Sequence, residues 1–95
     1  MILTTSGSTI TVEGNIKSQD DFNKIKNTVE GMTQSSSIHF NLINTMSMTS
    51  SVIGFLTKTI LKDKKSISME INDERLYGLL NDLNLIQTFN IKLKK

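Results

Sequence analysis

Apolar and polar residues alternate along several short stretches of the chain, and this period of two predicts β-strands. The predicted strands are 1–6, 9–13, 38–43, 66–71 and 88–93. Gly7-Ser8 lies between the first two, which predicts a hairpin turn. The strand 38–43 carries Ile38, Phe40 and Leu42 on one face and adds Ile43 on the other. This pattern is typical of a covered strand in a parallel sheet.

Other stretches place apolar residues at helical spacing. The predicted helices run from Ser18 to about Gln34, from about Ser50 to Lys62, and from the expected N-cap Asn72 to about Asn84. The apolar residues that define them are Phe22, Ile25, Val29, Met32, Val52, Ile53, Phe55, Leu56, Ile60, Leu61, Leu76, Leu79, Leu80 and Leu83. The middle helix has a wide apolar arc, so we expect it to pack closely against a sheet.

The predicted order is therefore β-β-α-β-α-β-α-β. Strands that alternate with helices imply right-handed crossovers, so we expect an α/β fold with a mixed, mostly parallel sheet and helices packed against it. A chain of 95 residues with 37% hydrophobic residues can bury one core, which predicts a single domain over 1–95.

Composition narrows the classes of function. No apolar run reaches the roughly 18 residues of a membrane span, and no basic segment precedes Ile2, so we expect neither a membrane helix nor a signal peptide. The net charge of +2 does not indicate a nucleic-acid partner. Cysteine is absent, which excludes disulfides and fits the cytoplasm. Met32, Met46 and Met48 could form an exposed patch for a homo-oligomer.

The sequence contains no template for catalysis or for a bound metal or cofactor. His39 lies in mid-strand with no histidine, cysteine or carboxylate at metal-ligand spacing, which favours a structural role. The acidic pairs Asp20-Asp21 and Asp73-Glu74 each lie at a predicted helix start, where capping explains them. We therefore expect a protein that is not an enzyme, without cofactor or metal.

The loop 44–51 is the strongest candidate for a functional surface. It follows a predicted strand at the edge of the sheet where α/β proteins bind ligands and partners, and five of its side chains are hydroxyls. Capping of the next helix by Thr49 or Ser50 explains only one of them. A phosphate on Ser50 would lie at a helix N-terminus, where backbone N–H groups favour an anion, and it would add about −1.5 to −2 charges to the surface.

The segment Thr49-Ser50-Ser51-Val52-Ile53-Gly54-Phe55-Leu56 resembles the phosphoacceptor turn of the STAS domain family, and the order of elements along the whole chain is similar to that fold. The family turn reads Asp-Ser-Ser-Gly-Leu-Gly, so Ser50 matches its phosphorylatable serine and Gly54 its last glycine. Thr49 replaces the aspartate and Val52 a glycine, and Lys17 or Ser18 stands where an acid often follows the second strand.

The resemblance implies an anti-sigma-factor antagonist that binds a kinase-like anti-sigma factor, which phosphorylates Ser50 and so ends the complex. Ser51 is the second candidate phosphoacceptor. The expected partner-binding residues are Asn15, Met46, Met48, Thr49, Ser50, Ser51 and Gly54. Two alternatives stay open: a non-phosphorylated, STAS-like adaptor subunit of a larger complex, for example one associated with transport, and an enzyme or small-ligand binder that uses the hydroxyl-rich loop.

Overall fold

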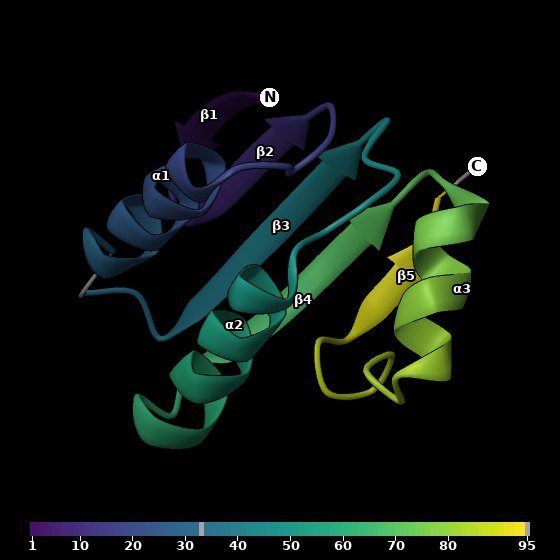
Figure 1. The fold of residues 1–95 in the computed structure, drawn as a ribbon. Coiled ribbons are helices and arrows are strands. Elements are labelled where there is room, and N and C mark those ends of the chain that lie inside the picture. Colours follow the sequence, from purple (N-terminus) through teal and green to yellow (C-terminus); the bar gives the residue numbers. More distant parts are fainter. Residues whose placement is uncertain (33, 95) are drawn as a thin grey trace.

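The computed structural model describes residues 1–32 and 34–94 and confirms a single small α/β domain. Its elements, in chain order, are β1 (Ile2–Ser6), β2 (Thr9–Glu13), α1 (Gln19–Glu30), β3 (Ser37–Ile43), α2 (Ser50–Lys62), β4 (Ser66–Ile71), α3 (Glu74–Asp82) and β5 (Ile91–Leu93). This is the predicted order of strands and helices (Figure 1).

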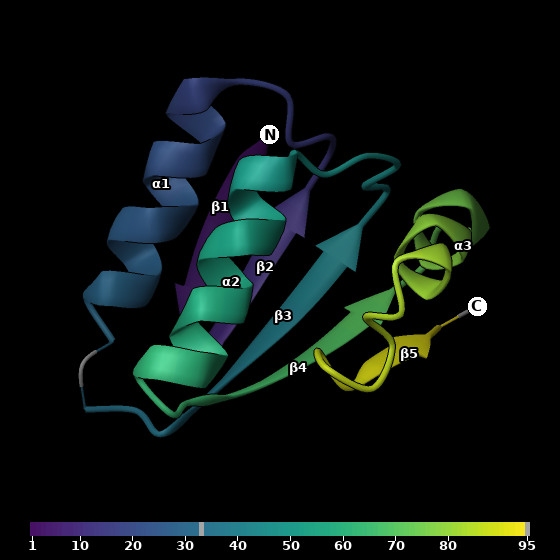
Figure 2. The ribbon, with the colours of Figure 1, turned by 60° about the horizontal axis from the view of Figure 1, so that its bottom comes forward.

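The five strands form one sheet in the order β1-β2-β3-β4-β5. β1 pairs with β2 antiparallel, and every later pair is parallel. From β2 onward, each new strand is added on the same side of the strand before it. Because the crossovers are right-handed, the connecting helices then all lie on one face of the sheet. Figures 1 and 2 show α1, α2 and α3 on this face. No helix of residues 1–32 and 34–94 lies on the opposite face.

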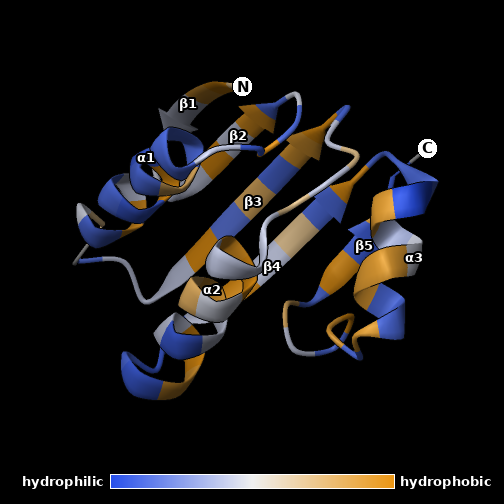
Figure 3. Ribbon diagram, viewed as in Figure 1, coloured by the Kyte–Doolittle hydropathy of each residue, from blue (hydrophilic) through white to orange (hydrophobic). Residues whose placement is uncertain are grey.

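The core lies between the sheet and its helices. Ile10, Phe40, Met69 and Ile91 form one row across four neighbouring strands, and each is buried. The buried helix residues that complete the core are Ile25, Val29, Val52, Leu56, Leu76 and Leu80. Figure 3 shows the alternation of hydrophilic and hydrophobic residues along β3 and β4 that directs one side chain in two toward this core.

Local signals explain where several elements begin and turn. Gly7 has a φ of 60° between β1 and β2, as the first central residue of a type II′ hairpin turn requires. Ser18 caps α1 in a capping box: its side chain accepts from the Asp21 N–H, and the Asp21 carboxylate accepts from the Ser18 N–H.

The structure corrects some predicted helix ends. α1 ends at Glu30 with Gly31 as its C-cap, and not near Gln34; Thr33, which the prediction included, lies outside the described residues. The N-cap of α3 is Asp73, whose carboxylate accepts from two backbone N–H groups, and not Asn72.

The predicted last strand was too long. Only Ile91–Leu93 pairs with β4, because the chain turns before it and Asn90 has a φ of 48°. The alternation of Phe89, Ile91 and Leu93 therefore spans a turn and a short strand.

Three leucines that the helical pattern placed inward are exposed, namely Leu61, Leu79 and Leu83. The expectation that both faces of β3 are covered is also wrong, because Figures 1 and 2 show α1, α2 and α3 on one face of the sheet. The alternation along β3 places His39 and Asn41 on the face opposite the buried Phe40. No helix among residues 1–32 and 34–94 is long and apolar enough to cross a membrane.

Candidate functional site

The loop between β3 and α2 is fastened to the segment that follows β2. The Thr45 hydroxyl donates to the Gly14 carbonyl at 2.9 Å, and the Thr45 side chain is fully buried. The Met46 N–H donates to Asn15 Oδ1 at 2.7 Å. The Gly14 N–H in turn donates to the Ile43 carbonyl at 2.9 Å. These bonds hold the backbone of the loop in one place before α2 begins.

A second set of contacts fastens the same loop to the segment that follows β4. The Asn44 N–H donates to Asn72 Oδ1 at 2.8 Å, and Asn44 itself has a φ of 53°, a left-handed conformation that asparagine tolerates. Arg75 Nη2 lies against Sδ of Met46. The segments that follow β2 and β4 therefore both support the loop, which lies where the carboxyl ends of the parallel strands meet.

α2 begins at this supported loop. Thr49 is its N-cap, and the Thr49 hydroxyl accepts from the Val52 N–H at 3.4 Å. Ser50 and Ser51 are the first two residues of the helix, and both are exposed. Gly54 is exposed one turn further on. Capping thus takes one hydroxyl and leaves the two candidate phosphoacceptors facing solvent.

The structure brings most of the expected partner-binding residues together around this helix start. The Asn15 side chain accepts a hydrogen bond from the Met46 N–H in the loop, and Met46 is 43% exposed. Met48 is not part of the exposed surface, since it is only 9% exposed and belongs to the core. Met32 is half-buried, so the three methionines do not form the exposed patch that was expected.

Two residues of this surface were not predicted from the sequence. Asn72 binds the loop through its side chain, although it was expected to cap a helix. Arg75 reaches Met46 from α3, and its side chain is 75% exposed. Both contacts join residues nearly thirty positions apart, 28 and 29 respectively. Only the alignment of β3 with β4 could have revealed them.

The first turn of α2 differs electrostatically from the other helix starts. α1 has Asp20 and Asp21 in its first turn and α3 has Glu74, whereas α2 has no acidic residue there. Hydrogen bonds from backbone N–H groups lower the pKa of two acids at the starts of the other helices. The largest effect on Asp21 comes from the Lys17 N–H, and the largest effect on Asp73 comes from the Leu76 N–H. The positive end of α2 has no such carboxylate.

These lowered pKa values predict a loss of stability in acid. A carboxyl group whose pKa is lower in the folded state than in the unfolded state stabilises the fold. This stabilisation is fully present above the unfolded pKa of about 3.9, and it is lost as the pH falls through the lower folded pKa. We expect the urea midpoint of the wild type to fall as pH drops below about 4. The double variant Asp21→Asn/Asp73→Asn should show a shallower fall, because the asparagine side-chain oxygen accepts the same backbone N–H groups but does not titrate.

The control for this prediction is Asp20→Asn, which removes a charge from the same turn of α1 without touching the capping box. It should retain the acid dependence of the wild type. Equal slopes for the double variant and the wild type would contradict the assignment of this dependence to the capping carboxylates.

Gly54 gives a prediction about stability. A Cβ built at this position meets no atom within 4 Å, and glycine in a helix interior is less favourable than alanine by about 0.5–1 kcal/mol. Gly54→Ala should therefore raise the free energy of unfolding by about that amount in urea titrations. Unchanged or lower stability would contradict this expectation.

His39 lies away from this site, on the open face of the sheet. Its Nδ1 is 2.7 Å from Ser68 Oγ, and its Nε2 is 3.6 Å from Glu70 Oε1. Lys94 Nζ lies 3.4 Å from the other oxygen of the same carboxylate. This carboxylate belongs to Glu70 in the neighbouring strand β4, and it was not predicted from the sequence around His39. Since α2 covers the other face, this histidine cannot act as a base for Ser50.

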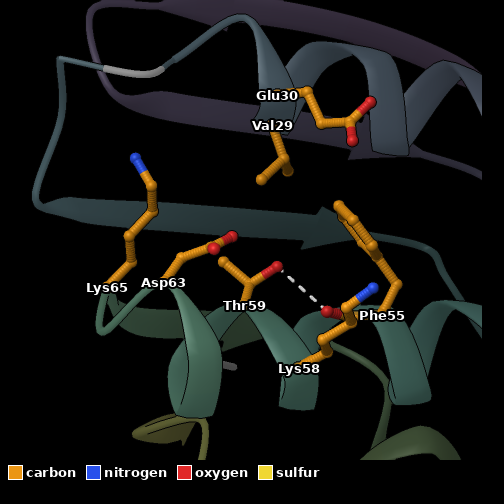
Figure 4. A pocket seen from close by; sticks show the side chains of 7 residues that line it. All are labelled: Val29, Glu30, Phe55, Lys58, Thr59, Asp63 and Lys65. Atoms are coloured by element: carbon orange, nitrogen blue, oxygen red, sulfur yellow. Dashed lines mark hydrogen bonds between the residues drawn. The ribbon is translucent and has the colours of Figure 1, made fainter.

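A cavity of about 570 Å³ lies between the C-terminal halves of α1 and α2 (Figure 4). Two of the polar side chains that line it bond to backbone carbonyls of the protein. The Thr59 hydroxyl donates to the Phe55 carbonyl at 2.9 Å. Lys65 Nζ donates to the carbonyls of Met32 and Ser35 at 2.9 and 2.7 Å. Ser50 does not line this cavity, so the cavity is not part of the exposed surface at the start of α2.

The fold and this site define a small α/β domain with an exposed, hydroxyl-bearing helix start on a supported loop. Comparison of the chain with protein-family models, curated proteins and solved structures finds no match.

Proposed function

We propose that this domain is a non-catalytic regulatory module that binds a protein partner through the turn Thr49–Gly54 and releases it when Ser50 is phosphorylated. The resemblance to STAS domains suggests the class of partner, a kinase-like anti-sigma factor in the cytoplasm. Ser51, beside Ser50, is the second candidate acceptor.

One observation carries the proposal: Ser50 is exposed at the first position of a helix whose first turn has no acidic residue. A phosphate there would be stabilised by the helix dipole and by free backbone N–H groups, so the fold tolerates the modification. The cap hydroxyl belongs to Thr49, and phosphorylation of Ser50 therefore leaves the cap intact.

The same geometry explains how a phosphate would end a complex. The surface around Ser50 contains an exposed methionine, Met46, and an exposed glycine, Gly54. A partner that packs closely on these residues would meet about −1.5 to −2 new charges and a bulky hydrated group. The domain keeps its shape, and only the contact surface changes.

The test is affinity capture from a lysate of the producing organism with immobilised wild type, Ser50→Asp and Ser50→Ala. We expect one protein with a nucleotide-binding kinase fold to be retained by wild type and Ser50→Ala. The same protein should be reduced at least about tenfold on Ser50→Asp, which corresponds to about 1.4 kcal/mol of binding free energy. Circular dichroism of the three proteins serves as the folding control.

Equal capture by Ser50→Asp and Ser50→Ala would overturn the switch. That outcome favours the second candidate function, a constitutive adaptor subunit of a larger complex. The departures at Thr49 and Val52 from the family turn are the observation that supports this alternative.

A further inference from the structure

The two edges of the sheet differ in how well they are protected against another strand. β5 is only three residues long and has Lys92 within it and Lys94 just after it. β1 has five residues, Ile2–Ser6, and none of them is charged or proline. Short strands, lysine and proline are the usual protection of a sheet edge, and β1 has none of them.

The outer side of β1 has backbone groups available for pairing. Ser6 pairs with Thr9 around the tight turn, so the ladder hydrogen bonds to β2 fall on Ser6, Thr4 and Ile2. The N–H and C=O groups of Leu3 and Thr5 then point away from β2. β1 ends the strand order, and in the part of the chain that the structure describes no helix or strand lies beyond it (Figure 1).

We propose that β1 pairs antiparallel with β1 of a second copy of this chain, which joins two sheets into one. A two-fold axis at Thr4 places Leu3 of each copy opposite Thr5 of the other. All four outward backbone groups on each chain then pair.

The side chains suit this register. Thr4 faces Thr4 of the second copy, a favourable cross-strand pair, and no like charges are opposed along the strand. Ile2, which is 62% exposed, lies opposite Ser6 of the other copy and loses part of its contact with water. A second copy thus satisfies backbone and side chains with one symmetric contact.

The interface is short, and interfaces well below about 1,200 Å² belong to weak complexes. We expect a dimer with a dissociation constant between about 10 µM and 1 mM. Sedimentation velocity of the wild type across this range should show a reversible shift from monomer to dimer.

Two variants test the register. Thr4→Lys places like charges on the axis, and its matched control Thr11→Lys adds the same charge on the same face one strand further in. Thr5→Pro removes an outward N–H, a position where edge strands accept proline. Thr4→Lys and Thr5→Pro should be monomeric at every concentration with wild-type circular dichroism, while Thr11→Lys should dimerise.

A wild type that stays monomeric up to about 1 mM would overturn the proposal and leave this edge to a strand from a different protein. Dimerisation that Thr4→Lys and Thr11→Lys weaken equally would also overturn it, because the contact would then lie elsewhere.

Discussion

Phe89→Ala is expected to lower the free energy of unfolding by about 3–5 kcal/mol, the largest loss from any substitution considered for this chain. Phe89 is fully buried although it lies in a turn before β5, and it belongs to the same core as the helices. Removal of the ring leaves a cavity beneath the α3–β5 connection. A small domain has a total stability of about 5–15 kcal/mol, so much of it would be lost.

Urea titration of wild type and variant measures this loss as a shift of the midpoint at constant slope. Leu79→Ala is the matched control, since Leu79 is 41% exposed and its truncation should change stability by no more than about 0.5 kcal/mol. Similar losses for both variants would contradict the position of Phe89 in the core.

Thr45→Val is expected to cost about 1–3 kcal/mol and to weaken partner binding at the same time. The substitution preserves shape but removes the hydroxyl that donates to the Gly14 carbonyl from a fully buried position. The loop that leads into α2 would lose one of its attachments. Because Ser50 and Gly54 follow this loop, the contact surface should become less well ordered.

Thr57→Val is the control for this prediction. The Thr57 hydroxyl donates to the Ile53 carbonyl within α2, and the side chain is half-buried, so the expected loss is within about 0.5 kcal/mol. Amide hydrogen exchange of Met46 provides a local readout, since its N–H is bonded to Asn15. Unchanged exchange in Thr45→Val would contradict the supporting role of the Thr45 hydroxyl.

Most of the fold could be predicted because each element carries its own pattern. The order of strands and helices, the parallel pairing and the Ser18 cap follow from local alternation, helical spacing and crossover rules. The predictions failed where a local pattern was ambiguous. Phe89 continues the alternation of Ile91 and Leu93, yet the left-handed Asn90 separates it from the strand.

The candidate site could be predicted only in part. The exposed helix start at Ser50 follows from the strand exit and from the capping preference of Thr49. The burial of Met48 and the contact of Arg75 with Met46 depend on how distant segments meet in space. The same holds for Glu70 beside His39, which depends on strand register. No local periodicity contains that information.

The central claim is that phosphorylation of Ser50 controls the contact surface at the start of α2. The most direct measurement is the intact mass of the protein purified from the organism that produces it, followed by mapping of any modified residue. We predict a substantial fraction with one added phosphoryl group, located on Ser50 or on the adjacent Ser51. A chain without any phosphoryl group, or with phosphate only outside these two residues, would contradict the claim.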